Sequence, residues 1–280
     1  MSVIEAVVLG IVQGLTEFLP VSSSGHLVLL QKIFGIKTPP LVFETFLHAG
    51  TLAAVLVVLR KDIFNLLKKP FQPLSGFIIL ATIPAVAAAL LFKDHIEHAF
   101  ATGQFLGFCF LITSALLITA EKLSRRAVLM DKQESMTWKD ALIIGVMQAI
   151  AIAPGISRSG ATISTALLRK LNRDLAARFS FLLSIPAIIG AFVLHAKDLV
   201  SIKIISAETT VPDAAENTLY ETMSAYAVIA GTITAAVIGF FAVKLMLKII
   251  REKSLYGFAV YTCVLGLLIL IDQYVTRIVF

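Results

Sequence analysis

Two short polar motifs hold the residues of this chain that could do chemistry. The first combines a carboxylate, hydroxyls and an imidazole around Pro20: Glu17, Ser22, Ser23, Ser24, Gly25 and His26. The second sets a guanidinium among hydroxyls after Pro154: Ser157, Arg158, Ser159, Gly160 and Thr162. A guanidinium binds phosphate oxygens, whereas a carboxylate, a serine and a histidine can supply an acid, a base or a nucleophile. The residue types therefore favour binding and attack on an anionic group.

The two motifs also repeat each other. A shift of 135 residues without a gap superimposes identical residues: Gly10 on Gly145, Gln13 on Gln148, Ser22 on Ser157, Ser24 on Ser159, Gly25 on Gly160 and Phe46-Leu47 on Phe181-Leu182. Such spacing predicts an internal duplication. Within the first motif, Gln13 and Glu17 lie at i and i+4 on one helix face, and Ser23 and His26 lie at i and i+3. The titratable groups are thus expected to converge at the first motif.

The composition places the chain in a membrane. Its 280 residues are 58% hydrophobic and 15% charged, with a mean hydropathy of +0.90, which lies outside the range of water-soluble domains. The net charge of +6 comes from short basic clusters beside apolar segments, which is the pattern of cytoplasmic loops rather than of a nucleic-acid-binding surface. The first apolar run lacks a basic leader, so we expect no cleavable signal peptide. Cys109 and Cys263 lie inside apolar runs and are expected to be free thiols.

Apolar segments of about 20 residues predict six membrane-spanning helices: Leu41–Leu59, Gly76–Phe92, Gln104–Ala120, Leu175–His195, Ala225–Leu247 and Tyr256–Tyr274. Two further apolar segments, Val3–Phe34 and Ala141–Leu171, must each enter and leave on one side if the basic clusters stay inside and the acidic connection 197–221 stays outside. The sequence thus predicts an all-α polytopic membrane protein, with one integral membrane domain over residues 1–280. It forms an inverted-topology repeat, about 1–120 and about 136–280, with re-entrant helical hairpins at 3–34 and 141–171.

Each hairpin is expected to turn at its proline. Pro20 and Pro154 end the first half-helices, and the serines that follow are good N-caps for the second half-helices. Both second half-helices would then present free N–H groups and a positive dipole end near the midplane, where an anion binds well. Polar groups at membrane depth are costly, so a duplicated pair of them indicates a functional site.

Structural explanations are also open for single residues. The serine run alone would suit a kink in a membrane helix, and Glu17 could be a buried acid paired with Arg158. His26 could be a hydrogen-bonded helix residue. His48 falls at i+4 from Glu44, so this pair could support the site from a neighbouring helix or form a simple intramembrane hydrogen bond.

The segments Gly10-Ile-Val-Gln13-Gly-Leu-Thr-Glu17-Phe-Leu-Pro20-Val-Ser-Ser-Ser-Gly25-His26 and Pro154-Gly-Ile-Ser-Arg158-Ser-Gly-Ala-Thr162 closely resemble two family signature motifs. The family is that of the undecaprenyl-pyrophosphate phosphatases, also called the bacitracin-resistance family. The resemblance covers essentially the whole chain. In that family a glutamate or a glutamine precedes the motif's glutamate by four residues. This chain has Gln13 there, which leaves Glu17 as the only carboxylate of the motif.

The resemblance implies an enzyme that hydrolyses undecaprenyl pyrophosphate to undecaprenyl phosphate and inorganic phosphate. This reaction recycles the lipid carrier for cell-wall synthesis and confers bacitracin resistance. We expect catalytic roles for Glu17, Ser23, His26 and Arg158, and phosphate binding by Ser22, Ser24, Gly25, Ser157, Ser159, Gly160 and Thr162, with Gln13, Glu44 and His48 in support. Glu17 would also hold a divalent cation, magnesium or calcium.

The partners expected are a polyprenyl pyrophosphate substrate and membrane lipid, with no nucleic acid; the oligomeric state, a homodimer included, is open. The protein would lie in a bacterial plasma membrane, with the site facing the exterior leaflet. The nucleophile is open as well. His26 could attack phosphorus directly, Ser23 could attack with His26 as base, or His26 could activate water.

Two other functions are compatible with parts of the pattern. Inverted repeats with broken helices also build transporters, so the same groups could bind a lipid phosphate for flipping. Clustering of Glu17, Ser23 and His26 on one hairpin alone argues instead for catalysis. Fragments such as Ser24-Gly25-His26 are also similar to motifs of phosphatidic-acid-phosphatase-type enzymes, but the remaining elements of those motifs are missing.

Overall fold

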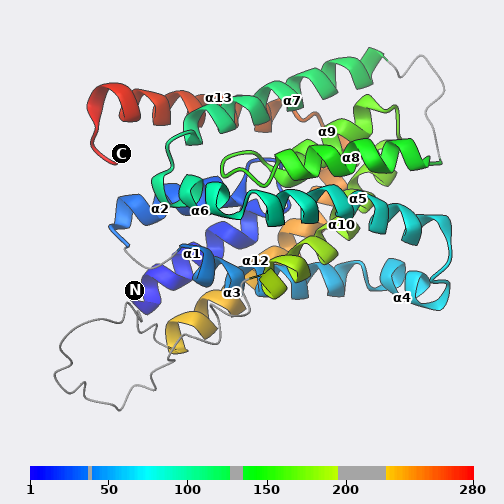
Figure 1. Cartoon of the computed structure of the whole chain (residues 1–280), viewed down its shortest axis with the longest axis horizontal. Coiled ribbons are helices and arrows are strands. Elements are labelled where there is room, and N and C mark those ends of the chain that lie inside the picture. The colour runs from blue at the N-terminus through cyan, green and yellow to red at the C-terminus, as the bar shows by residue number, and fades with distance from the viewer. Residues whose placement is uncertain (37–39, 127–134, 195–224) are drawn as a thin grey trace.

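The computed structural model describes residues 1–36, 40–126, 135–194 and 225–280, and within these ranges the regular structure is helical. In chain order the helices are α1 (Val3–Thr16), α2 (Ser23–Phe34), α3 (Pro40–Val58), α4 (Arg60–Lys68), α5 (Pro73–Leu91), α6 (Lys93–Thr102), α7 (Leu106–Arg126), α8 (Trp138–Ile150), α9 (Arg158–Leu168), α10 (Arg173–Leu194), α12 (Ala225–Glu252) and α13 (Tyr256–Ile271), followed by a π-helical turn η2 (Asp272–Thr276). In Figure 1, α5, α7, α8 and α13 run roughly along the long axis of the molecule, and α10 and α12 run obliquely to it.

Five segments are long and apolar enough to cross a membrane: Pro73–Leu91, Leu106–Ser124, Arg173–Leu194, Ala225–Glu252 and Tyr256–Thr276. They correspond to five of the six predicted spans. The sixth, predicted over Leu41–Leu59, coincides with α3, a helix of 19 residues of which Phe43–Val58 is an apolar stretch. The chain is therefore a polytopic helical membrane protein. The acidic connection 197–221, predicted to lie outside, falls beyond the described residues.

The two predicted hairpins are each broken into a pair of short helices. α1 and α2 are joined through Pro20, and α8 and α9 through Pro154. Ser22 caps α2 by accepting from the Gly25 N–H (3.3 Å), and Ser157 caps α9 by accepting from the Gly160 N–H (3.0 Å). The predicted N-caps are thus confirmed. In Figure 1 the α1–α2 pair begins at the left of the molecule and α8 begins at the right.

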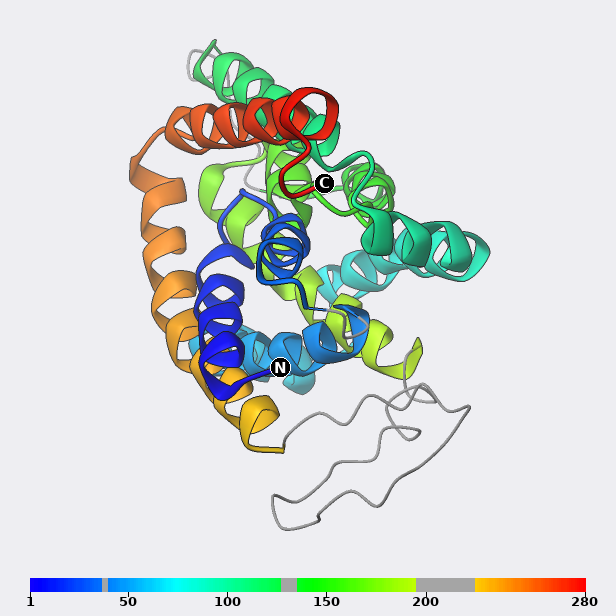
Figure 2. The ribbon, with the colours of Figure 1, turned by 90° about the vertical axis from the view of Figure 1, so that its left-hand side faces the viewer.

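The hairpins pack against helices from the opposite half of the sequence. α1 runs along α12, which also covers α3, and α8 runs along α5; Figure 2 shows α12 as the outer wall beside α1. The repeated glycines make these contacts close. A Cβ on Gly10 would lie 2.5 Å from the Gly231 carbonyl oxygen, and one on Gly145 would lie 2.5 Å from that of Ala81. Small residues let membrane helices approach closely, which explains the two glycines of the repeat.

Buried aromatic residues pack next to the first hairpin. Phe18, directly after Glu17, meets Phe181 of α10 edge to face, with 5.4 Å between ring centroids, and both side chains are fully buried. This contact fixes the chain between α1 and the first turn of the hairpin. Cys109 and Cys263 are free thiols, as predicted. The short helices α4 and α6 were not predicted.

Candidate active site

The tips of the two hairpins touch each other. Ser159 at the second tip donates a hydrogen bond to the Leu19 carbonyl oxygen of the first (2.9 Å). The backbones are also in close contact, because a Cβ on Gly25 would lie 2.9 Å from the Cα of Gly155. The two motifs, 135 residues apart in sequence, therefore form one site.

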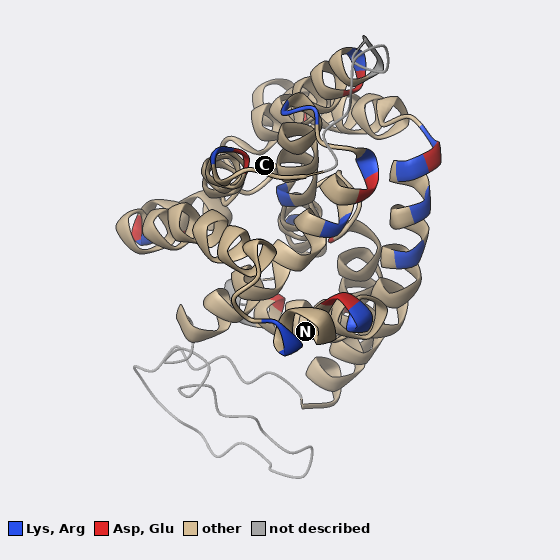
Figure 3. Ribbon diagram, turned by 90° about the vertical axis from the view of Figure 1, so that its right-hand side faces the viewer, with Lys and Arg blue, Asp and Glu red and all other residues tan. Residues whose placement is uncertain are grey.

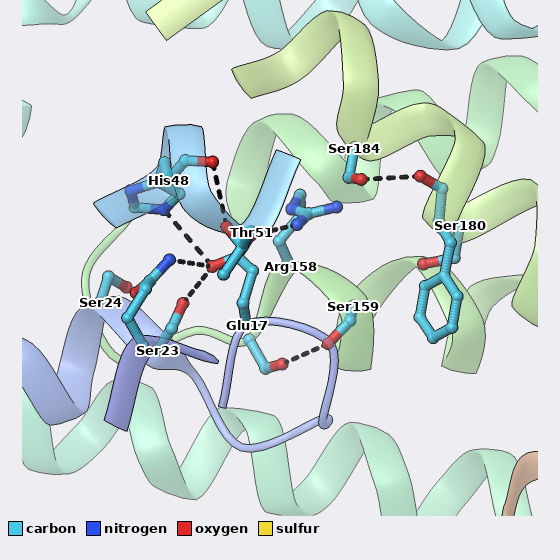
Figure 4. A network of polar contacts seen from close by, with 12 residues as sticks. Glu17, Ser23, Ser24, His48, Thr51, Arg158, Ser159, Ser180 and Ser184 are labelled. Carbon is cyan, nitrogen blue, oxygen red and sulfur yellow. Dashed lines mark hydrogen bonds and ion pairs between the residues drawn. The ribbon is translucent and has the colours of Figure 1, made fainter. Parts of the chain in front are cut away.

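Glu17 lies at the centre of this site (Figure 4). One carboxylate oxygen pairs with the Arg158 guanidinium of the opposite tip. The other accepts from the Gln13 amide (3.0 Å) and the Ser23 hydroxyl (2.6 Å), and it lies 3.3 Å from His48 Nε2. The side chain of Glu17 is only 4% exposed, so water cannot hydrate it fully. These partners supply the hydrogen bonds and charge that water would give an exposed carboxylate. The Glu17–Arg158 pair considered from the sequence is present.

His48 joins the site from α3. Its Nδ1 lies 2.7 Å from the backbone carbonyl oxygen of Glu44, while Nε2 faces the Glu17 carboxylate. A carbonyl and a carboxylate oxygen are both acceptors, so this orientation suits a ring with a hydrogen on each nitrogen. The structure thus brings the expected supporting residues Gln13, Glu44 and His48 to the site, and it places His48 in direct contact with Glu17.

His26 does not point toward Ser23. Its Nε2 lies 2.6 Å from the hydroxyl of Tyr261 on α13, and its Nδ1 lies 2.7 Å from the Ser22 carbonyl oxygen. The ring stacks on Tyr261, with an interplanar angle of 4°, and meets Phe110 edge to face. The convergence of Ser23 and His26 that the i, i+3 spacing suggested is therefore absent: Ser23 turns to Glu17, and His26 turns to the opposite wall.

The hydroxyls of the two tips form matching networks. The Ser22 and Ser24 hydroxyls lie 3.3 Å apart, and those of the equivalent Ser157 and Ser159 lie 3.2 Å apart. Thr162 is turned away, donating to the Arg158 carbonyl oxygen (2.9 Å) and lying 2.6 Å from the Ser180 hydroxyl. In the structure, Thr162 thus fixes α9 rather than facing the centre of the site.

Ser22 is one of the few non-glycine residues with a positive φ, 69°. Most side chains avoid this left-handed region, and strain of this kind is concentrated at functional sites. The conformation turns the chain sharply after Pro20, so that Ser23 begins α2 with its hydroxyl on Glu17.

A cavity of about 650 Å³ adjoins the tips. Its polar end is formed by Glu17, Ser23, Glu44, His48, Gln148 and Arg158, and its walls are apolar segments of α5 and α10. Three of these lining residues keep a buried polar atom that has no partner among the described residues: Glu44 Oε1, both amide atoms of Gln148 and Arg158 Nη1. Buried polar groups are rarely left unpaired, so these atoms indicate a polar ligand.

Reasoning from the motifs missed three residues of the site. Tyr261 holds His26, and Thr113 on α7 holds the second tip, accepting from the Ser157 N–H (3.0 Å) and donating to the Gly155 carbonyl oxygen (3.1 Å). Neither lies in a motif or repeat. Gln148 did carry a signal, because it is the repeat equivalent of Gln13.

A metal ion would find few protein ligands here. Within the described ranges, no group of three or more His, Cys, Asp or Glu side chains is placed to hold one. Glu17 and Glu44 both line the cavity, however, and one buried Glu44 oxygen has no partner among the described residues. Magnesium commonly binds through one or two carboxylates together with substrate phosphates. Glu17 and Glu44 are thus the residues that would hold a cation shared with a phosphate ligand.

Known proteins match this chain over nearly its whole length. A protein from Carboxydothermus hydrogenoformans named undecaprenyl-diphosphatase is 46% identical over 98% of both chains. Undecaprenyl-diphosphatase 3 of Bacillus cereus is 44% identical over 98% of both chains, and the undecaprenyl-diphosphatase of Halothermothrix orenii is 41% identical over 97% of this chain and 98% of its own. The family model described as bacitracin resistance protein BacA matches residues 6–268. With both motifs inside that match, the chain belongs to the BacA family of bacitracin resistance proteins.

Proposed function

We propose that this protein is an undecaprenyl-diphosphatase, which hydrolyses undecaprenyl pyrophosphate to undecaprenyl phosphate and inorganic phosphate. Membership of the BacA family and the names of its relatives support this function. The observation that carries it is the meeting of Glu17, Ser23 and Arg158 beside a cavity with an apolar wall. A pyrophosphate on a long prenyl chain matches this site, because its anionic end suits the polar residues and its prenyl chain suits the apolar wall. The transport alternative gains no support from the comparisons.

Arg158 would bind the terminal phosphoryl group. One of its terminal nitrogens pairs with Glu17, whereas Nη1 has no partner among the described residues. A guanidinium offers a planar fork of donors that matches phosphate oxygens. The first-turn N–H groups of α2 and α9 add further donors, since a helix N-terminus is an anion site. Gln148, whose amide atoms have no partner in the part of the chain that the structure describes, would contribute a neutral contact from the cavity wall.

Ser23 would be the nucleophile. Its hydroxyl already donates to Glu17 at 2.6 Å, whereas His26 faces away from it. Glu17 would accept the Ser23 proton on Oε2, the oxygen that Ser23 already contacts, while Arg158 is on the other carboxylate oxygen. A bond forms between the serine oxygen and the terminal phosphorus while the bridging P–O bond breaks, and undecaprenyl phosphate leaves. Water then cleaves the phosphoserine to inorganic phosphate.

Glu17 and Glu44 would hold a divalent cation together with the pyrophosphate oxygens. When bound, such a cation neutralises part of the pyrophosphate charge. His48 lies 3.3 Å from the same Glu17 oxygen that accepts from Ser23, and it would keep the carboxylate in place. His26, anchored to Tyr261 and to the Ser22 carbonyl oxygen, would hold the first turn of α2 in the conformation that presents Ser23.

The prenyl chain would lie along the apolar wall formed by α5 and α10. Six spans and two re-entrant hairpins in an inverted repeat would bring both tips to the midplane of a bacterial plasma membrane, with the cavity open to the exterior leaflet. The hairpins' starts at opposite ends of the molecule and their packing on helices of the other half support this layout.

Acid-quench experiments with terminally labelled undecaprenyl pyrophosphate test the proposed chemistry. We expect phosphate release that chelator abolishes and magnesium or calcium restores, and an acid-stable phosphoryl group on Ser23 detectable by peptide mass spectrometry. Gln148→Ala should raise KM more than it lowers kcat. Phosphohistidine is lost in acid, so a parallel alkaline quench tests His26. A phosphoryl group on His26 after that quench, or full activity of Ser23→Ala, would exclude the serine mechanism.

A further inference from the structure

A second cavity, of about 640 Å³, shares no lining residue with the one at the hairpin tips. It lies where α3 meets α4, beside the first turns of α10 and the C-terminal half of α12. Its basic lining residues are Arg60, Lys61, Arg178, Lys244, Lys248 and Arg251. Figure 3 shows basic residues recurring along α12, at the right edge of the view.

Two of these six basic residues are neutralised within the fold. Arg178 binds Asp62 (2.9 Å) and Asp174 (2.9 Å), and Arg251 also pairs with Asp174. These contacts fix one wall of the cavity. The other four cations make no ion pair with any carboxylate that the structure describes: Arg60, Lys61, Lys244 and Lys248.

These four cations come from two elements that face one cavity. Arg60 also donates to the Val57 carbonyl oxygen (3.2 Å), and Lys244 lies over the Phe240 ring. Lys244 and Lys248 are exposed and share a face of α12 at i and i+4. Arg60 and Lys61 begin α4 and are also exposed. Glu252 is the only acidic lining residue besides Asp62, so the cavity retains a net positive charge. An anion bound there would meet cations from both sides.

The surroundings of the cavity are apolar. Val58, Leu59 and Leu247 line it, and beyond it α4 exposes Phe64 (57%) and Leu67 (73%). A short helix with a basic face and exposed apolar side chains lies at the boundary between lipid headgroups and acyl chains. By the distribution of basic clusters, this end of the molecule faces the cytoplasm. A ligand with a phosphate and an acyl chain therefore fits better than a free ion.

We infer that this basic cavity is a binding site for an anionic phospholipid of the cytoplasmic leaflet. Lys244, Lys248, Arg60 and Lys61 hold the headgroup phosphate, and the acyl chains pass over Val58 and Leu247. Basic pockets between membrane helices on the cytoplasmic side bind anionic headgroups in this way. The site is independent of the proposed phosphatase reaction, because it uses none of the tip residues.

Native mass spectrometry of the full-length protein in detergent tests this site, with dioleoylphosphatidylglycerol as the probe and dioleoylphosphatidylcholine as the neutral comparison. Wild type should retain phosphatidylglycerol in preference to phosphatidylcholine. K244Q/K248Q should bind phosphatidylglycerol about 30-fold more weakly, since each basic residue near an anionic lipid contributes about a factor of five. The control K68Q/K139Q removes two exposed lysines of the same end that lie outside the cavity and should bind like wild type.

Size-exclusion chromatography and thermal unfolding would verify that each variant is folded. If K244Q/K248Q does not fold, R60Q/K61Q from the opposite wall gives the same test. If K68Q/K139Q loses as much affinity for phosphatidylglycerol as K244Q/K248Q does, or if wild type retains phosphatidylcholine equally well, the inference is overturned. Diffuse attraction between the basic surface and lipid would then explain the binding. Displacement of the lipid by inorganic phosphate, at concentrations where chloride of equal ionic strength has no effect, would overturn it in favour of a free-phosphate site.

Discussion

At the scale of single residues, the site depends on an ion pair that crosses between the two hairpins. Glu17 and Arg158 are far apart in sequence and largely buried, with side chains 4% and 16% exposed. Burying two charges away from water costs desolvation free energy, which their mutual attraction offsets. If one partner is removed, the other charge stays buried without that attraction. The pair therefore stabilises the contact between the tips and also holds both groups ready for a phosphate.

The Glu17–Arg158 ion pair should contribute to the free energy of unfolding. Glu17→Gln and Arg158→Met should each lower the free energy of unfolding by about 3–5 kcal/mol, because each leaves a buried charge without its partner. The double variant should lose less than the sum of the two, since no unpaired charge from the pair remains. Thermal unfolding in detergent, with Lys139→Met as an exposed control, measures this. Additive losses would show that the two charges do not interact.

Tyr261 is predicted to position His26. Tyr261→Phe removes the hydroxyl that lies 2.6 Å from Nε2 but keeps the aromatic stack. We expect kcat to fall about tenfold, in line with one lost hydrogen bond, with KM unchanged. His26→Ala should cost more, about 100-fold or beyond, because the first turn of α2 also loses its anchor. Steady-state phosphate release separates kcat from KM. An unchanged kcat in Tyr261→Phe would remove Tyr261 from the account.

At the scale of the elements, the two tips meet through glycine. A Cβ on Gly25 would lie 2.7 Å from the Phe110 ring and 2.9 Å from the Gly155 backbone, so Gly25→Ala must push the tips apart. A displacement of this kind in an active site can cost about 100-fold in rate. Gly76→Ala on α5 is the matched control, because its Cβ would meet nothing within 4 Å. Phosphate release should fall only in Gly25→Ala, and wild-type activity of that variant would argue against close apposition of the tips.

Asp140 fixes the start of the second hairpin, outside the five candidate spans. It accepts from the Thr137 N–H (2.9 Å) in a capping box and pairs with Arg169 (2.7 Å). Burial alone would raise its pKa, but the hydrogen bonds from Thr137 and Arg169 outweigh it and lower the pKa below the usual value.

This lowered pKa makes the stability contribution of Asp140 dependent on pH. Because the folded pKa is the lower one, the contribution is complete above the ordinary carboxyl range, about pH 4, and is lost as the pH falls through the lowered pKa. Asp140→Asn should therefore be less stable than wild type at pH 7, by about 1 kcal/mol. The difference between their unfolding midpoints should shrink toward pH 3. A constant difference across this range would contradict the assignment.

The elements also show what sequence alone could and could not predict. Helix breaks are local events, so Pro20, Pro154 and the caps Ser22 and Ser157 could be predicted from their neighbours. The short helices α4 and α6 were missed because they are too short and too polar to appear as apolar segments of spanning length.

Side-chain direction at the site depended on tertiary contacts. Ser23 and His26 diverge because the positive φ of Ser22 directs one toward Glu17, while Tyr261 on a distant helix holds the other. The spacing of two residues on a helix predicts their shared face but not the partner that each one finds.

At the scale of the whole molecule, two similar motifs form an asymmetric site. Both halves supply a broken hairpin with capping serines, and each hairpin packs on a helix of the other half. The first tip alone carries the acid and the histidine, and the second alone carries the arginine. Neither half contains a complete set of groups, so cleavage should require both hairpins.

That requirement is tested most directly by phosphate release from undecaprenyl pyrophosphate, comparing wild type with Glu17→Ala at the first tip and Arg158→Ala at the second. Each variant is compared in detergent with a folded control, Lys139→Ala. Both tip variants should lose at least about 1,000-fold in kcat/KM, as expected when a group that stabilises transition-state charge is removed, while the control keeps wild-type activity. A folded Arg158→Ala protein with near wild-type turnover would show that the first tip acts alone, and it would contradict the account.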